Sequence, residues 1–163
     1  EQSRGGNMIR LLVFSDSHGV RQPMKELYDR YLNDGVIHLG DHIADARWLL
    51  QRTNGHPVYQ VLGNCDIGER GYERQLLELG GAKILIMHGH RYGVKSGYCT
   101  ALAAAKAEGA QAVLFGHTHI PFMERRDGIL MLNPGSLRNP NREYAIIEIE
   151  DGTVKGVLLQ DAE

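Results

Sequence analysis

Residues 8–19 read MIRLLVFSDSHG and decide how the rest of the chain folds. The first seven of these residues, 8–14, form a short and nearly continuous apolar run, which ends in the polar segment Ser15-Asp16-Ser17-His18-Gly19. An apolar run of this length that stops at polar and glycine residues is typical of a buried strand. The segment therefore predicts a strand that opens into a loop carrying Asp16 and His18.

Helical and strand patterns alternate after this first strand. Two helices are predicted by apolar residues at helical spacing, namely Met24, Leu27, Tyr28 and Tyr31 in the first and Ile43, Ala46, Leu49 and Leu50 in the second. Pro23 fits a first helical turn. Residues 36–39 and 57–62 have the pattern of short strands. This alternation favours parallel βαβ units.

The second half of the chain is predicted to consist mostly of hairpins. Glycine-containing turns separate three pairs of strand-like segments, which are 72–79 and 82–87, 120–125 and 129–132, and 144–150 and 154–159. One further helix, with Tyr98, Ala101, Leu102 and Ala105 on one face, and a strand at 111–115 lie between the first two pairs. The pattern predicts an α/β fold, a mixed β-sandwich with helices outside and polar loops at the strand ends.

The composition is that of one ordinary globular domain. The 163 residues are 42% hydrophobic and 23% charged, and 18 Lys+Arg against 20 Asp+Glu give a net charge of −2. This length leaves room for one core, and the near-neutral charge argues against a basic nucleic-acid-binding face. The longest apolar run, 101–105, is far shorter than the ~20 residues that span a bilayer. We expect residues 1–7 to be an added leader and residues 8–163 to be a single domain.

The two cysteines, Cys65 and Cys99, cannot form the disulfide framework of a small secreted domain. They do not form a CxxC pair, so a zinc ribbon is not indicated. The cysteine content therefore favours a reducing, cytoplasmic location.

Polar residues with metal-binding chemistry follow the predicted strands. They are Asp16, His18, Asp41, Asn64, His88, His117 and His119. Ligands of open α/β sheets bind beyond the carboxyl ends of the strands, where loops from distant parts of the sequence meet. Carboxylate, amide and imidazole groups are ligands for Mn²⁺, Fe, Zn²⁺, Ni²⁺ or Co²⁺. The placement of these residues predicts a metal site.

The chain resembles the calcineurin-like metallophosphoesterases. The resemblance rests on five motifs in the family's order, which are Asp16-x-His18, Gly40-Asp41, Gly63-Asn64, His88-Gly89-His90 and Gly116-His117-Thr118-His119. It extends from Met8 through Asn133-Pro134-Gly135-Ser136 to the last hairpin and is closest to a small bacterial and archaeal phosphodiesterase branch. It implies a four-layer αββα sandwich of two mixed β-sheets flanked by helices.

The resemblance also implies a dinuclear metal centre that hydrolyses a small phosphodiester. Asp16, His18 and His119 would hold one divalent ion, with Mn²⁺ the first expectation. Asn64, His88 and His117 would hold the other, and Asp41 would bridge the two. Metal-bound hydroxide would then attack the phosphorus atom. No membrane partner or strong nucleic-acid binding is expected, and the oligomeric state is left open, with a homo-oligomer allowed.

His90 and Cys65 are the candidate catalytic side chains. Many family members have a histidine at the position of Cys65, where it is thought to assist the leaving group. General-acid assistance is worth about 100-fold to 10,000-fold in rate, so its loss favours diesters with good leaving groups over monoesters. His38, His42 and His56 are assigned structural roles.

Two alternatives stay open at this point. One is a phosphomonoesterase that uses the same metal site. The other is a non-catalytic interaction scaffold like the retromer subunit of this fold, which has lost several metal ligands. Every ligand position is filled in the present sequence, which favours the enzyme.

Overall fold

The first apolar run forms strand β1 (Ile9–Phe14), the middle strand of a sheet with the order β10-β9-β1-β2-β3. Strands β2 (Gly35–His38) and β3 (Val58–Gln60) run parallel to β1 and are connected through helices α1 (Arg21–Arg30) and α2 (Ile43–Leu50). The predicted βαβ units are therefore confirmed. The structure is a computed structural model that describes residues 8–161, and the expected leader, residues 1–7, lies outside the described residues.

The hairpins complete this sheet and build a second one. Strands β9 (Glu143–Glu150) and β10 (Thr153–Gln160) extend the first sheet in antiparallel fashion. The second sheet has the order β4-β5-β6-β8-β7 and consists of β4 (Arg74–Leu79), β5 (Ala82–Met87), β6 (Ala112–Leu114), β7 (Phe122–Arg126) and β8 (Ile129–Asn133). Its three inner strands are parallel and its two outer strands are antiparallel to their neighbours, so both sheets are mixed.

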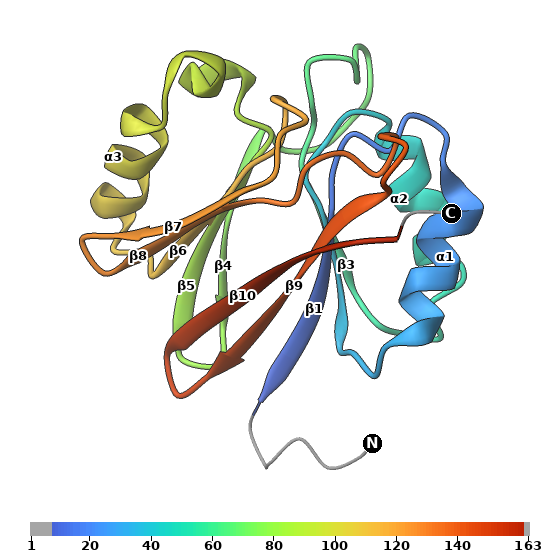
Figure 1. Ribbon diagram of the computed structural model, residues 1–163, viewed down its shortest axis with the longest axis horizontal. Coiled ribbons are helices and arrows are strands. Elements are labelled where there is room, and N and C mark those ends of the chain that lie inside the picture. The colour runs from blue at the N-terminus through green and yellow to red at the C-terminus, as the bar shows by residue number, and fades with distance from the viewer. Residues whose placement is uncertain (1–7, 162–163) are drawn as a thin grey trace.

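Alternating side chains on β1 show how the layers are packed. Leu11 and Val13 point into a core between the two sheets, whereas Leu12 and Phe14 pack against α1 and α2. Helix α3 (Cys99–Glu108) covers the outer face of the second sheet, with Ala101, Leu102 and Ala105 packed on β5 and β6. Figure 1 shows the two sheets face to face, with α1 and α2 on one side and α3 on the other. The predicted four-layer αββα architecture is confirmed.

The structure differs from the sequence prediction at the ends of both N-terminal helices. Tyr31 lies just beyond α1 in an extended conformation, and its hydroxyl is hydrogen-bonded at 2.6 Å to the Tyr144 hydroxyl on β9. Leu50, expected on the packed face of α2, is 44% exposed at the last residue of that helix. Two short 3₁₀ helices that no pattern indicated, η1 (His90–Tyr92) and η2 (Val94–Ser96), connect β5 to α3. No helix of residues 8–161 is long and apolar enough to cross a membrane.

Burial in the core between the sheets predicts a large loss of stability when an inner side chain is shortened. Ile147 on β9 is fully buried there, so Ile147→Ala should lower the free energy of unfolding by about 2–5 kcal/mol. Val157 on the neighbouring strand β10 is 45% exposed, so Val157→Ala should cost less than about 1 kcal/mol. Urea unfolding of both variants measures the difference, and equal losses would contradict the proposed layer packing.

Candidate metal centre

Loops from both sheets meet at the carboxyl ends of the parallel strands. The loop after β1 is fixed to the loop after β2 by a 3.0 Å hydrogen bond from the Asp16 N–H to the Gly40 carbonyl. The loop after β6 is fixed to the end of β5 by a 2.9 Å bond from the Gly116 N–H to the His88 carbonyl. The His88 ring joins the two sheets, since its Nδ1 lies 2.7 Å from the Leu39 carbonyl oxygen. Residues far apart in sequence are thereby collected at one edge.

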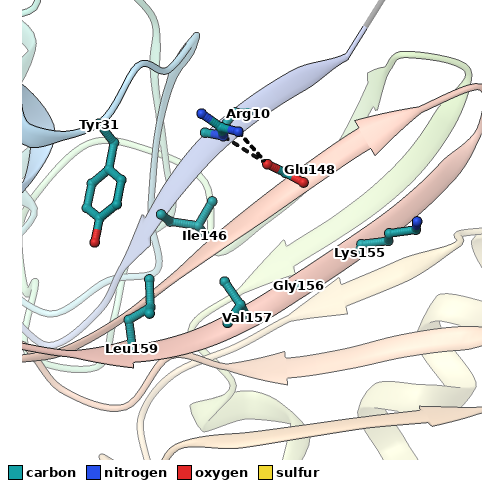
Figure 2. Close-up of a pocket in the computed structure, with 8 residues that line it drawn as sticks. All are labelled: Arg10, Tyr31, Ile146, Glu148, Lys155, Gly156, Val157 and Leu159. Carbon is teal, nitrogen blue, oxygen red and sulfur yellow. Dashed lines mark hydrogen bonds and ion pairs between the residues drawn. The ribbon is translucent and has the colours of Figure 1, made fainter. Parts of the chain in front are cut away.

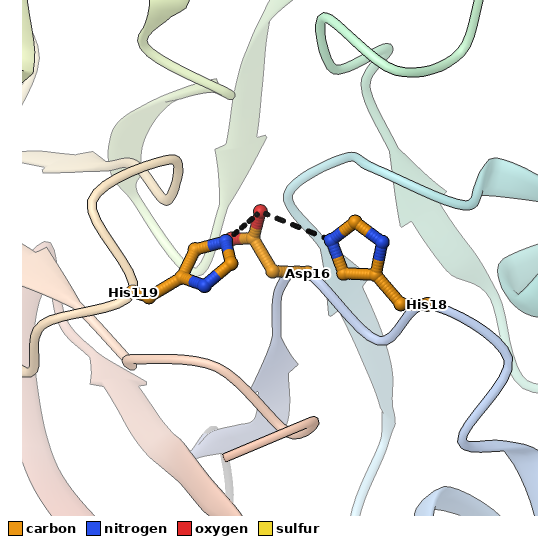
Figure 3. A group of neighbouring side chains, drawn as sticks. All are labelled: Asp16, His18 and His119. Carbon is orange, nitrogen blue, oxygen red and sulfur yellow. Dashed lines mark hydrogen bonds and ion pairs between the residues drawn. The ribbon is translucent and has the colours of Figure 1, made fainter.

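The first cluster of candidate ligands consists of Asp16, His18 and His119, as the sequence predicted for one ion. Their ligand atoms all lie within 4.8 Å of one another. Asp16 Oδ1 is 3.1 Å from His119 Nε2 and 4.0 Å from His18 Nε2. Figure 3 shows the two imidazole rings on opposite sides of the Asp16 carboxylate. This arrangement leaves one oxygen and two nitrogen donors facing a common point.

The second cluster consists of Asp16, Asp41 and His88, all of them buried. His88 Nε2 is 3.4 Å from Asp41 Oδ2 and 3.8 Å from Asp16 Oδ1. Asp41 Oδ2 also lies 3.8 Å from His18 Nε2. The Asp41 carboxylate is therefore placed between an imidazole of the first cluster and the imidazole of the second.

Asn64 and His117 lie beside these clusters. Asn64 Oδ1 is 3.1 Å from His88 Nε2. The His117 ring is 5.0 Å from the His88 ring, and its backbone N–H donates to Asp16 Oδ2 at 3.2 Å. The two clusters consist of His, Cys, Asp and Glu side chains of residues 8–161, so an asparagine such as Asn64 is not among their members. His117 is not a member of either cluster. The assignment of Asn64, His88 and His117 to a second ion stays a prediction.

The two candidate catalytic residues lie at the edge of the centre. The His90 ring is 5.5 Å from the His88 ring, and its Nδ1 is buried with no hydrogen-bond partner. Cys65 is exposed, and its backbone N–H donates to Asp41 Oδ1 at 2.9 Å. Partial burial and the nearby charge of Asp41 raise the pKa of the Cys65 thiol. The thiol is therefore neutral near pH 7 and is a poor nucleophile.

The donor atoms fit divalent metal ions. His88 donates its Nδ1–H to a carbonyl, so Nε2 is the atom that faces the carboxylates, as in histidine ligands oriented by a backbone partner. His18 Nε2 is buried without any hydrogen-bond partner, a costly arrangement that a cation between Asp16 and Asp41 would relieve. Two buried carboxylates and several imidazoles form the donor set of borderline transition metals.

The protonation states of His18 and His117 also suit metal binding, whereas His88 has to lose a proton to bind an ion, because the hydrogen bond and charges of Asp41 and Asp16 outweigh burial and raise its pKa. Burial lowers the pKa of His18, and burial together with the charge of His88 lowers the pKa of His117 to about 4. Both imidazoles are therefore neutral at pH 7, as a ligand must be. Burial raises the pKa of Asp16, whereas at Asp41 the hydrogen bond and charge of His88 outweigh burial and hold the pKa below its usual range.

The loops hold their ligands in an unusual backbone conformation. Five of the seven predicted ligands have positive φ, which are Asp16 (53°), His18 (44°), Asp41 (60°), His117 (69°) and His119 (62°). Each such residue costs of order 1 kcal/mol, and strain of this kind clusters at functional sites. Neighbouring glycines allow the loops to approach each other closely. A Cβ atom at Gly116 would lie 2.0 Å from Ser15 Oγ, and one at Gly63 would lie 2.1 Å from Asp41 Oδ1.

Sequence reasoning missed Asp66, which supports two of the loops. Its carboxylate accepts hydrogen bonds of 2.8 to 3.0 Å from four backbone N–H groups, those of Asp41, His42, Ile43 and Gly63. It thereby caps the N-terminus of α2 and connects the loops that carry Asp41 and Asn64. The preference of helix N-termini for a carboxylate was a usable signal, but the capping residue is 20 or more positions away in sequence.

The segment from Asn133 to Ser136 also supports the centre. Asn133 Nδ2 donates to the Gly116 carbonyl at 3.0 Å and to Thr118 Oγ1 at 2.9 Å. Ser136 Oγ donates to the Asp16 carbonyl at 2.9 Å. Gly135 has a φ of 86°, and its N–H donates to the Asn133 side chain. The segment therefore braces the loops after β1 and β6.

Two hollows on the surface lie at different distances from this centre. One, of about 350 Å³, begins at Asn64 and His90 and is also lined by Ile67 and Arg91. Arg91 Nε is held 2.6 Å from Glu73 Oε1 on the wall of this hollow. The other, of about 380 Å³, lies on the outer face of the first sheet between Tyr31 and β10 (Figure 2) and contains none of the predicted site residues. The first hollow is the one that adjoins the centre.

The sequence and the fold are both similar to known proteins. A model of the calcineurin-like phosphoesterase superfamily domain matches residues 9–152. The probable metallophosphoesterase YsnB of Bacillus subtilis is 35% identical over 153 residues, with 88% of this chain and 86% of YsnB covered. The crystal structure of a predicted phosphoesterase from Streptococcus pneumoniae has a TM-score of 0.81 at 32% identity, with 96% of this chain and 92% of that chain covered.

Two more distant proteins are also similar to this chain. The phosphodiesterase YfcE of Escherichia coli is 27% identical in an alignment 160 positions long, with 82% of this chain and 82% of YfcE covered. Vps29 of Entamoeba histolytica, crystallised with Zn²⁺, has a TM-score of 0.76 at 22% identity, with 93% of this chain and 99% of that chain covered. The latter similarity shows the fold alone.

His38, buried beneath the centre, predicts a pH dependence of stability. Burial lowers its pKa to about 4 from 6.5, so between these pH values the unfolded chain binds a proton that the folded protein does not. The free energy of unfolding should therefore fall as the pH is lowered from about 7 to about 4. In His38→Gln this fall should be smaller by up to about 3 kcal/mol, as measured by urea unfolding in the presence of a chelator. If the free energy of unfolding of both proteins depends on pH in the same way, His38 is protonated in the folded state at the same pH as in the unfolded chain.

Proposed function

The chain belongs to the calcineurin-like phosphoesterase superfamily, and we propose that it is a metal-dependent phosphodiesterase with a dinuclear metal centre. The observation that carries the proposal is the convergence of two buried carboxylates and the imidazoles of His18, His88 and His119 on one small region. The bridging position of Asp41, in reach of both His18 and His88, supports two ions rather than one.

In this proposal seven side chains hold the two ions. Asp16, His18 and His119 bind one ion, Asn64, His88 and His117 bind the other, and Asp41 binds both. Mn²⁺ is the first candidate among Mn²⁺, Fe, Zn²⁺, Ni²⁺ and Co²⁺. When bound, the ions supply positive charge and lower the pKa of bound water. Only two of the seven ligands are anionic, so the site keeps an excess of positive charge for a phosphate ester.

The surrounding residues suit the binding of a small ester. The hollow of about 350 Å³ that begins at Asn64 and His90 lies within the size range of ligand sites and would hold one alcohol group of a diester. Ile67 at its rim is 90% exposed and would contact an apolar alcohol group. His90 lines this hollow and would contact the phosphate group of a bound ester.

The absence of an imidazole at position 65 favours diesters over monoesters. A neutral thiol is a weak hydrogen-bond donor and gives little help to a poor leaving group. The relative YfcE is named a phosphodiesterase, which agrees with this choice. A purely structural role like that of a scaffold is less well supported, because all seven ligand positions carry donor side chains.

Metal loading tests the dinuclear centre. Elemental analysis after dialysis against Mn²⁺ should give about two ions per chain, and a chelator should abolish hydrolysis of bis(4-nitrophenyl) phosphate while far-UV circular dichroism stays native. Asp41→Asn should weaken the binding of both ions, because the carboxylate lies between both clusters. His119→Ala should chiefly weaken one ion, since its ring contacts only the first cluster. Saturation of the wild type at one ion would overturn the dinuclear proposal.

The side chain at position 65 tests the preference for diesters. Cys65→His introduces a general acid and should raise activity on alkyl monoesters by a larger factor than activity on an activated aryl diester. Cys65→Ala should keep aryl diester cleavage within about tenfold of wild type, because the metal ions provide the larger part of catalysis. Steady-state kinetics on both substrates give the ratio of monoester activity to diester activity for each variant.

Metal content measured on the same samples serves as the control for these variants. Loss of diester cleavage in Cys65→Ala with both ions retained would mean that the thiol takes part in the chemistry. If both variants change the activity on both substrates by the same small factor, the Cys65 side chain has a packing role only.

A further inference from the structure

A chain of buried polar side chains lies beneath the loops that carry His18 and Asp41. Ser17 Oγ is 2.9 Å from His38 Nε2 and donates a 2.6 Å hydrogen bond to Asp45 Oδ2. The Gly40 N–H donates to His38 Nδ1 at 3.2 Å, so His38 carries its proton on Nε2 and donates it to Ser17. Ser17, His38 and Asp45 are each 0% exposed. These hydrogen bonds therefore connect the loop after β2 with the loop after β1.

Asp45 holds both neighbours of His18. Its Oδ2 atom accepts from Ser17 Oγ and, at 2.7 Å, from the Gly19 N–H. These two bonds fix the backbone on either side of His18, whose φ is 44°. A histidine in this region of backbone space is strained, so the loop needs such bonds to keep it there.

The carboxylate of Asp45 is fully satisfied and charged. Its other oxygen, Oδ1, accepts from Arg21 Nε at 2.7 Å. Burial opposes ionisation, but the hydrogen bonds from Ser17, Arg21 and Gly19 outweigh it and hold the pKa of Asp45 below its usual range. Hydrogen bonds to a buried charge are strong and costly to break. The network is therefore rigid where Asp45 is hydrogen-bonded to the loop after β1.

We propose that Ser17, His38 and Asp45 are positioning residues that hold His18 in its ligand geometry. The proposal rests on the proposed function, because it needs a metal ion at His18. The three residues resemble a Ser-His-Asp triad in composition only. All three are buried, and the Ser17 hydroxyl is bonded to a carboxylate instead of a base, so it has no route to a substrate. Their role is to act through His18 on metal affinity.

Removal of one hydroxyl tests the proposal. Ser17→Ala should weaken Mn²⁺ binding about tenfold at one ion and change the other by less than twofold, as measured by isothermal titration calorimetry. Thr53→Val is the matched control, because Thr53 is a fully buried hydroxyl at the far end of α2 that donates to the Leu50 and His56 carbonyls. It should lower the thermal midpoint and leave Mn²⁺ affinity within twofold of wild type.

A double-mutant cycle shows whether the effect passes through His18. In a His18→Ala background, Ser17→Ala should change Mn²⁺ affinity by less than twofold, since the residue that it positions is gone. Wild-type affinity in Ser17→Ala would overturn the proposal, and so would a tenfold loss that persists without His18. If Ser17→Ala fails to fold, Asp45→Asn is measured in the same cycle with the same criteria. A wild type that binds no Mn²⁺ would instead overturn the proposed metal centre itself.

Discussion

The proximity of two buried carboxylates, Asp16 and Asp41, is the constraint on which the structure depends. Both lie next to His88 Nε2 and His18 Nε2, and no Lys or Arg side chain of residues 8–161 forms an ion pair with either carboxylate. Two like charges in a buried place repel each other unless cations or hydrogen bonds compensate them. Divalent ions are the compensation that the donor set fits, and without them His88 compensates part of the charge, since its hydrogen bond and charge outweigh burial and lower the pKa of Asp41.

The centre depends on the packing of the two sheets, because each sheet supplies half of it. Asp16, His18 and Asp41 follow strands of the first sheet, whereas His88, His117 and His119 follow strands of the second. The apolar core between the sheets therefore sets the distance between the two halves. A shift between the sheets would change every distance across the site, which explains why a rigid sandwich suits this chemistry.

Support from side chains around the centre keeps the strained loops in place. Asp66 ties the Asp41 loop to the Asn64 loop, and Asn133 and Ser136 brace the loops after β6 and β1. Asp45 holds the residues that flank His18. Each of these supports uses backbone groups that the left-handed turns leave without a partner in a helix or strand. The cost of the turns is thus offset by hydrogen bonds to buried side chains, two of them carboxylates and two of them neutral.

The sequence by itself determined the order of strands and helices and the polar residues that follow the strands, whereas the four layers were implied by the resemblance of its motifs to a known family. It could do so because strand and helix periods and the motifs after each strand are local signals, read within about ten residues. Only the tertiary structure decided that Arg91 pairs with Glu73, and that Asp45 and Asp66 hold the loops. These contacts join residues 18 to 26 positions apart, and such pairings have no periodic signature. Their geometry is fixed by how the two sheets and α2 pack.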